Sequence, residues 1–148
     1  MPFKFPLDIL LRFRRSVEIQ RELRLQEANQ RVTLVEQHIR QLESLKAELR
    51  TREIRELESG IRASELHFHG TCRNALSSRE QELRQQLKAA EEIRNACLKD
   101  YRHARQERDV VDTLRNHQLA EYRGEESRRE QRALDDMFLL RREFLRRG

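Results

Sequence analysis

Proline is absent after Pro6, and the 148 residues contain only four glycines. Sheet folds need turn residues at short intervals, so neither a β-sandwich nor a doubly wound α/β fold suits this chain. Charged residues make up 39% and hydrophobic residues 36%, which is too few apolar residues for a compact core. Leu, Ile and Val nevertheless recur throughout, and the net charge is only +5, which argues against disorder. The expected fold class is all-α, built from long, solvent-exposed helices.

Hydrophobic residues in the first half of the chain recur at alternating spacings of three and four, with Lys46 at one skipped position. This period is typical of the seam of a coiled coil. Beyond Leu49 the stripe is predicted to slip in register and to continue through Ile54, Leu57 and Ile61. The predicted seam consists of Leu25, Ala28, Val32, Val35, Ile39, Leu42 and Leu49.

The second half carries a weaker stripe, which Arg94 and Arg108 interrupt. Further on, the stripe is predicted to shift and to continue through Leu114, Leu119 and Tyr122. The main part of this stripe consists of Leu76, Leu83, Leu87, Ala90, Cys97, Tyr101, Ala104 and Val111. A last stripe near the C-terminus consists of Ala133, Met137, Leu140 and Phe144.

One break is expected between the two halves, at residues 60–63. Gly60 suits the position just past a helix end, and Ser64 is predicted to cap the helix that follows. Gly70 is the alternative break, although a single glycine inside a helix costs only about 1 kcal/mol. The sequence therefore favours a turn near Gly60.

Folding the chain at this turn predicts a single antiparallel hairpin over residues 1–148, with helices at about 6–59 and about 64–146. Beyond about residue 122 the second helix has no partner and overhangs. A lone amphipathic helix is marginally stable in water, so this overhang needs a partner. The pairing places Phe3 near Tyr122, Leu10 opposite Leu114 and Phe13 opposite Val111.

The sequence offers no clear catalytic constellation and no phosphate-binding loop. Carboxylate pairs such as Glu91 and Glu92 are sequence neighbours, so they point to different sides of a helix. His69 and Cys72 could share a metal ion, but a structural zinc site takes four ligands. Cys72 and Cys97 are too far apart along one helix for a disulfide, which suits a reducing cytosol. We therefore expect a non-enzymatic cytoplasmic protein without a metal or a cofactor.

The surplus positive charge is almost entirely arginine, with 27 Arg and 4 Lys. Solvated helix faces explain most of it; docking onto an acidic partner is the alternative. Outside the two ends of the chain, acidic residues are interleaved with the basic ones and no continuous basic face emerges, which argues against nucleic acid binding. The chain ends are rich in Arg and Phe, a composition typical of protein interfaces. The residues at the ends are Phe3, Phe5, Arg12, Phe13, Arg14, Arg15, Phe138, Arg141, Arg142, Phe144, Arg146 and Arg147.

The opening motif Phe3-x-Phe5-x-Leu7-x-x-Leu10-Leu11-x-x-Arg14 resembles the start of FliJ proteins of the flagellar type III export apparatus. The motif Gly60-Ile61-x-x-Ser64 between two long heptad helices resembles the middle of these proteins. The late motif Glu130-Gln131-x-x-Leu134-Asp135-Asp136 is similar to their Glu/Gln…Asp-Glu signature. The resemblance covers the whole chain and implies a two-helix antiparallel coiled coil, similar to the central stalk of rotary ATPases.

The resemblance also implies three partners: the hexameric export ATPase, the membrane export gate protein and export chaperones. It places the protein in the cytoplasm, peripheral at the cytoplasmic face of the inner membrane at the flagellar base. The end with the two termini would dock into the ATPase ring, through Phe13, Arg14, Arg15, Glu18, Arg21, Arg24, Arg141 and Arg142. A strip beside the turn would contact the gate or a chaperone, through His38, Leu42, Leu45, Leu49, Cys72, Leu76, Arg79 and Leu83.

Other functions remain open at the level of sequence. A generic coiled-coil scaffold would dimerise through the apolar residues that the hairpin leaves unburied. The stalk, in contrast, is expected to be a monomeric hairpin. An injectisome stalk protein would share the architecture of the flagellar one. Among the residues of the strip, Leu45 lies one position off the seam and is therefore the better candidate for an exposed contact.

Overall fold

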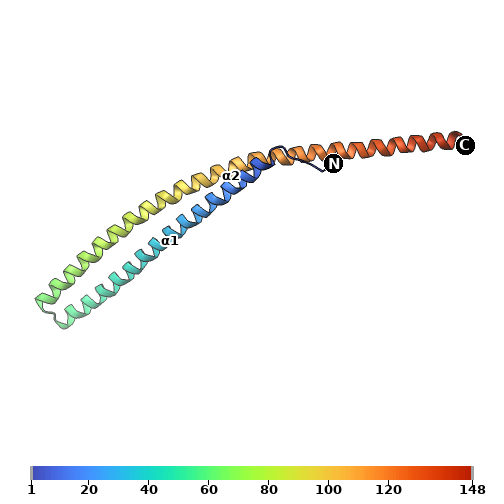
Figure 1. Cartoon of the computed structure of the whole chain (residues 1–148). Coiled ribbons are helices and arrows are strands. Elements are labelled where there is room, and N and C mark those ends of the chain that lie inside the picture. Colours follow the sequence, from blue (N-terminus) through green and yellow to red (C-terminus); the bar gives the residue numbers. More distant parts are fainter. Residues whose placement is uncertain (1, 148) are drawn as a thin grey trace. The chain divides into compact units, whose positions relative to one another are not determined.

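The computed structural model describes residues 2–147 and folds them into two α-helices joined by a short turn (Figure 1). Helix α1 covers Asp8–Ser59 and helix α2 covers Ala63–Arg147. Within residues 2–147 there is no strand, and the two helices form the antiparallel hairpin that the sequence predicts. Met1 and Gly148, which belong to the predicted domain of 1–148, lie outside the described residues.

The ends of the helices follow from local sequence. Pro6 and Leu7 form a turn ahead of α1, and the N–H of Asp8 donates a hydrogen bond to the carbonyl of Phe5 at 3.2 Å. Gly60 follows the end of α1 with a φ of 92°, a left-handed conformation that glycine adopts without strain. Ser64 lies inside α2, so its predicted role as the cap is wrong: residues 60–62 already complete the turn, and the helix begins at Ala63.

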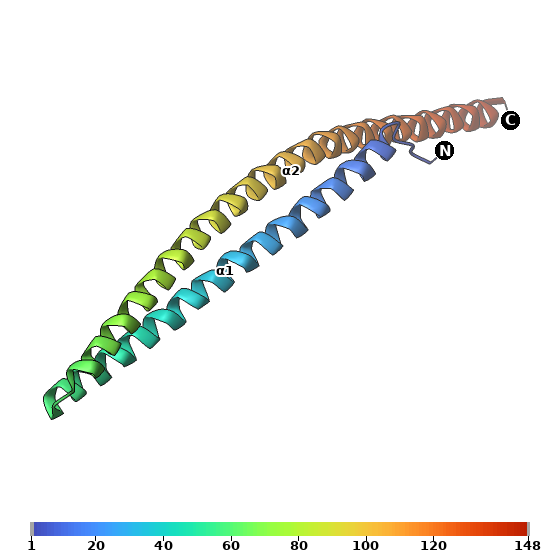
Figure 2. The ribbon, with the colours of Figure 1, turned by 60° about the vertical axis from the view of Figure 1, so that its left-hand side comes forward.

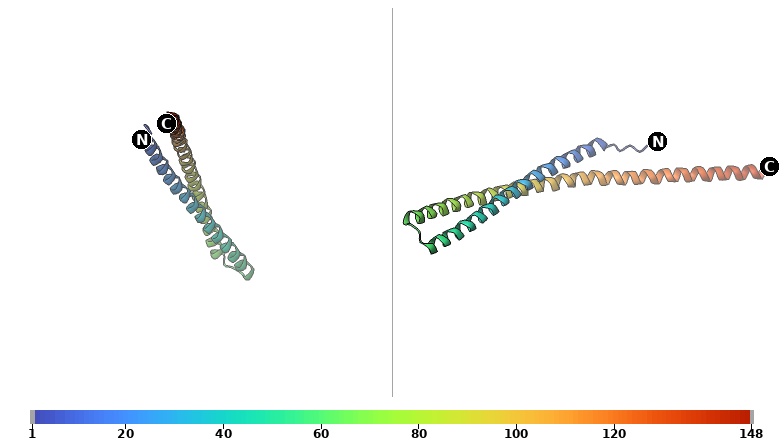
Figure 3. Two further views of the ribbon diagram at one scale, coloured as in Figure 1. Left: turned by 90° about the vertical axis from the view of Figure 1, so that its right-hand side faces the viewer. Right: turned by 90° about the horizontal axis from the view of Figure 1, so that it is seen from below.

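Packing divides the hairpin into two units, each of which contains a part of both helices. We call Ile19–Arg102, which includes the turn, the turn unit. We call the described residues outside this range, 2–18 and 103–147, the terminal unit. Within each unit the segments of α1 and α2 run side by side in opposite directions (Figures 2 and 3).

In the turn unit, the predicted apolar seam forms the core. Val35, Ile39 and Leu42 from α1 pack against Leu83 from α2, and each of these side chains is buried. Ala28, Val32 and Ala90 are buried along the same seam. The sequence spacing of three and four therefore located the core of this unit.

The predicted slip in register after Leu49 is wrong. Ile54 and Leu57 are 52% and 49% exposed, so they do not continue the seam. The heptad period instead stays in phase, and Glu53 and Glu56 occupy the half-buried seam positions. Acidic residues are tolerated there because each meets a partner side chain from α2, Arg73 for Glu53 and His69 for Glu56.

In the terminal unit, the N-terminal segment folds onto α2. Phe5, Leu11 and Val111 form a buried cluster, with Phe3 and Leu10 packed against it. The ring of Phe3 lies 5.5 Å from the ring of Tyr122, a contact that the predicted pairing anticipated. This cluster anchors the start of the chain to α2.

Two details of the predicted pairing in this unit are wrong. Phe13 is 57% exposed and does not pack on Val111. It lies two positions after the buried Leu11, so it falls on the outer face of α1. Leu114 is 39% exposed, and the seam of α2 stays in phase instead of shifting to it.

The end of α2 continues past the last contact with the N-terminal segment. Every residue in the range 125–147 is exposed, and we call this range the α2 extension. Figure 3 shows it running on with no second helix beside it. This segment is the overhang that the sequence predicts. Among the described residues, no helix is both long and apolar enough to cross a membrane.

Candidate partner-binding surfaces

Charged residues replace apolar ones in the seam of the terminal unit. Arg14 and Glu18 stand at heptad positions that face α2, in phase with Leu11. The guanidinium of Arg14 forms an ion pair with Glu107 across the two helices. Arg14 also lies over the ring of Phe13, with its guanidinium carbon 5.8 Å from the ring centre. Arg14 is therefore held by contacts within the chain.

A second layer joins Glu18 to Arg108. The Nε of Arg108 donates to Oε2 of Glu18 at 2.5 Å, and its Nη2 donates to Oε1 at 3.3 Å. Its Nη1 donates to Asp112 at 3.2 Å, and Asp112 in turn accepts from Arg15 at 3.4 Å. The hydrogen bond with Glu18 raises the pKa of Arg108 above its ordinary value, and the nearby carboxylates of Asp109 and Asp112 add to the effect.

The arginines predicted to contact an ATPase ring are therefore in two different situations. Arg14 and Arg15, like Glu18, form ion pairs with residues of α2. The remaining four have no ion-pair partner within residues 2–147. These four are Arg21 and Arg24 in the turn unit and Arg141 and Arg142 in the α2 extension. Sequence analysis did not identify Glu107, Arg108 and Asp112 as the partners of these residues. Such pairs can be found only once the register between α1 and α2 is known.

The strip beside the turn is divided in a similar way. Leu42 and Leu83 are buried in the seam, and Leu49, Cys72 and Leu76 are half-buried along it. These five side chains hold the two helices together, which leaves little of them for a partner. The exposed members of the strip are His38, Leu45 and Arg79. Leu45 is 44% exposed, in agreement with its position off the seam.

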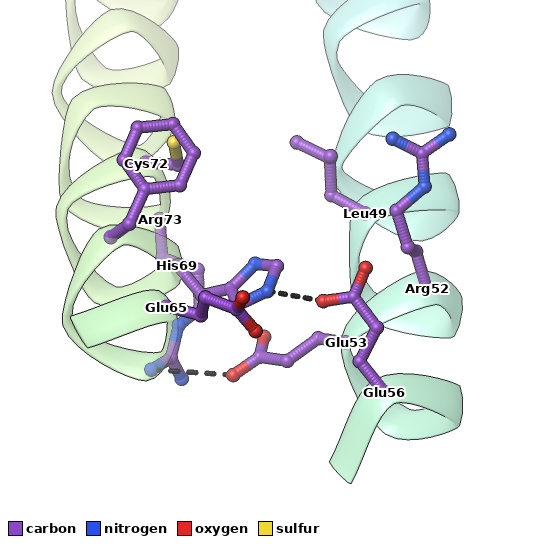
Figure 4. Close-up of a pocket in the computed structure, with 9 residues that line it drawn as sticks. Leu49, Arg52, Glu53, Glu56, Glu65, His69, Cys72 and Arg73 are labelled. Carbon is purple, nitrogen blue, oxygen red and sulfur yellow. Dashed lines mark hydrogen bonds and ion pairs between the residues drawn. The ribbon is translucent and has the colours of Figure 1, made fainter. Parts of the chain in front are cut away.

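A cavity of about 340 Å³ opens between the helices close to the turn (Figure 4). His69 from α2 lies 2.5 Å from Glu56 of α1, measured from Nε2 to Oε2, and its side chain is only 16% exposed. Arg73 lies 3.6 Å from Glu53, from Nη2 to Oε1. Glu53 and Glu56 in this cavity thus each have a partner side chain from α2.

The cavity brings together His69 and Cys72, the residues that the sequence marked as a weak metal-binding candidate. Three or more suitably placed ligands would be needed to hold an ion there. Among the described residues, no group of three His, Cys, Asp or Glu side chains has such a geometry. Cys72 and Cys97 are both free and half-buried.

A further charged layer lies between this cavity and the apolar core of the turn unit. Lys46 forms an ion pair with Glu80 at the position that the predicted seam skipped. Arg84 donates to Glu80 at 2.9 Å and approaches Glu43 at 3.4 Å. The hydrogen bond from Lys46, followed by that from Arg84, lowers the pKa of Glu80 below its ordinary value. These cross-helix pairs favour one alignment of α1 against α2 in the turn unit.

The α2 extension presents the largest group of exposed apolar side chains. Each large apolar residue in it is more than half exposed, and Phe144 reaches 78%. Seven arginines lie in the extension, and four of them are at its end, at positions 141, 142, 146 and 147. The exposed apolar residues are Leu134, Met137, Phe138, Leu139, Leu140, Phe144 and Leu145.

Fold and surfaces together define an all-α protein of the two-helix, antiparallel coiled-coil class. The family model described as "Flagellar FliJ protein" matches residues 3–148. The chain belongs to the FliJ family, whose members are components of the flagellar protein export apparatus. No match was found among curated proteins or among solved structures.

Proposed function

We propose that this protein is a non-enzymatic stalk of the flagellar export apparatus, which docks into the hexameric export ATPase. The observation that carries the proposal is the α2 extension, where unpaired arginines and exposed Phe and Leu side chains stand together. Exposed Phe13 and unpaired Arg21 and Arg24 on α1 support it. Aromatic residues and arginine are the side chains that most often dominate binding at protein interfaces.

The mechanism would be mechanical and allosteric. A two-helix coil has no six-fold symmetry, so inside a six-fold ring it meets each subunit differently. Arg141 and Arg142 would form charge-assisted hydrogen bonds with acidic residues lining the pore. Subunits that make these contacts would favour one conformation, which would raise hydrolysis. Arg14 and Arg15 would contribute less than the sequence suggested, because Glu107 and Asp112 already neutralise them.

The turn unit would supply the contact with the export gate or with an export chaperone. His38, Leu45 and Arg79 are the exposed members of the predicted strip. Each of them stands one position before a seam residue of its helix. In an antiparallel pair these positions lie on the same side of the seam, so one partner could touch all three. Contact with the gate would hold the protein at the cytoplasmic face of the inner membrane, at the flagellar base.

The first prediction concerns hydrolysis by the export ATPase. Purified export ATPase should turn over faster when this protein is added. The double substitution Arg141→Glu and Arg142→Glu should abolish most of the gain, because like charges would then face the pore. Arg31→Glu with Arg55→Glu changes the same charge at exposed α1 positions without ion pairs, and it should leave the gain intact. An unchanged rate with the wild-type chain would rule out this mechanism.

A further inference from the structure

The apolar residues of the α2 extension fall on one wide face of the helix. At about 100° per residue, the apolar side chains between positions 133 and 145 cover a sector of roughly 160°. All of these side chains are exposed. Leu139 is the single apolar residue of this segment that points away from the sector. The residues of the apolar sector are Ala133, Leu134, Met137, Phe138, Leu140, Phe144 and Leu145.

Arginines occupy both edges of this apolar sector. Viewed down the helix axis, Arg142 lies beside Phe138 at one edge of the sector, and Arg147 lies beside Leu140 at the other edge. Asp135, Asp136 and Glu143, the acids of this segment, all fall outside the sector. Residues 137–147 contain four arginines and one acid, so the end of the helix is strongly basic. A broad apolar face with arginine at its edges is the pattern of helices that lie in a membrane interface.

From this arrangement we infer that the α2 extension binds directly to the surface of a bilayer that contains anionic lipids. The sector would sink into the boundary between headgroups and acyl chains. Arg142 and Arg147 would reach lipid phosphates from the two edges. Arg141 lies inside the sector, and its long side chain would bend up to a phosphate as well. This contact is interfacial and needs no membrane-spanning helix.

A second copy of the chain fits the same face less well. The seam of a two-stranded coil is a narrow stripe, whereas this sector has bulky side chains up to both edges. An antiparallel pair that sets Ala133 opposite Phe144 would also bring Asp136 of one copy near Glu143 of the other. These are like charges at flanking positions, which destabilise such a pair. The geometry therefore favours a flat, anionic surface over a partner helix.

This inference does not depend on the proposed role in the ATPase ring. Both contacts use the same helix, so they exclude one another. The lipid-bound chain is therefore a state of the protein outside the ring. Vesicle binding and stimulation of hydrolysis are measured separately, and the failure of either leaves the other unaffected.

Neighbouring residues on opposite faces of the extension provide the test. The chain contains no tryptophan, so a single introduced one reports alone. Vesicles with about 30% phosphatidylglycerol in phosphatidylcholine serve as the anionic surface, and pure phosphatidylcholine as the neutral one. With the anionic vesicles, the emission of Phe138→Trp should shift to the blue. The emission of Leu139→Trp should change little, because position 139 lies opposite the apolar sector.

Co-sedimentation of the full chain with the same vesicles gives the affinity. Phe138→Glu should weaken binding about tenfold or more, whereas Leu139→Glu should leave it close to that of the wild-type chain. Arg142→Glu with Arg147→Glu should also weaken binding and should reduce its dependence on salt. Circular dichroism of each variant checks that the hairpin still folds, which is expected because every changed position is exposed.

Three results would overturn the inference. Absence of binding above the level seen with neutral vesicles would exclude a lipid surface. Equal responses at positions 138 and 139 would mean that the chain binds only as a basic polymer. A concentration-dependent dimer that Phe138→Glu abolishes, seen by sedimentation without lipid binding, would assign the face to a second copy.

Discussion

The turn unit and the terminal unit both combine apolar and charged layers, but the buried apolar seam is larger in the turn unit. In the turn unit, Leu42 and its neighbours pack an apolar core against Leu83. In the terminal unit, Arg14 occupies the same heptad position as Leu42. Its guanidinium is paired with Glu107 of α2. An apolar layer stabilises almost any register of a coiled coil, whereas a charged layer is satisfied in only one. From this comparison we expect the apolar seam to supply most of the stability and the charged layers to specify the alignment.

The largest expected effect comes from the apolar layer. Leu83→Ala should lower the free energy of unfolding by about 2–3 kcal/mol, because Leu83 is 3% exposed and its removal leaves a cavity. Leu45→Ala removes the same side chain from a position that is 44% exposed, and it should cost under about 1 kcal/mol. Urea unfolding followed by circular dichroism measures both. Equal losses would contradict the assignment of the core.

A smaller effect is expected from the charged layer of the terminal unit. Glu18→Arg places a cation against Arg108 and should destabilise by about 1 kcal/mol. The charge swap Glu18→Arg with Arg108→Glu should recover part of this loss, because the pair is restored with its charges exchanged. A double-mutant cycle in urea gives the coupling energy. Strictly additive single and double losses would show that the layer does not specify the alignment.

The smallest effect concerns pH and the Lys46–Glu80 layer. The pKa of Glu80 is lowered on folding, so its stabilising contribution is present above the ordinary value of 4.5 and is lost as the pH falls below it. Glu80→Gln should therefore destabilise the hairpin at pH 7 and have less effect near pH 3. Glu58→Gln, at an exposed position without an ion pair, provides the matched control. Equal pH profiles for both variants would contradict the role of Glu80.

The sequence was sufficient to predict the two helices, the turn at Gly60 and most of the apolar seam, because each depends on local spacing. It was not sufficient where charged residues occupy seam positions. The stripe was predicted to slip in register after Leu49. Only the register across the helices reveals that Glu53 and Glu56 occupy seam positions, with Arg73 and His69 as their partners. For the same reason the predicted ring contacts Arg14 and Arg15 turned out to be engaged within the chain. The predicted partners themselves stay predictions, since exposure says where a surface is free and not what covers it.

The backbone of Gly60 has a consequence for stoichiometry. Its φ of 92° lets the chain reverse within three residues, so α1 and α2 meet as parts of one molecule. Tethering at such short range gives each helix an effective partner concentration on the order of millimolar. A side chain at this position would be strained in the turn and would favour a continuous helix through it. Each seam would then find its complement in another chain, by exchange of identical helices. One residue without a side chain is thus expected to favour pairing within a single chain.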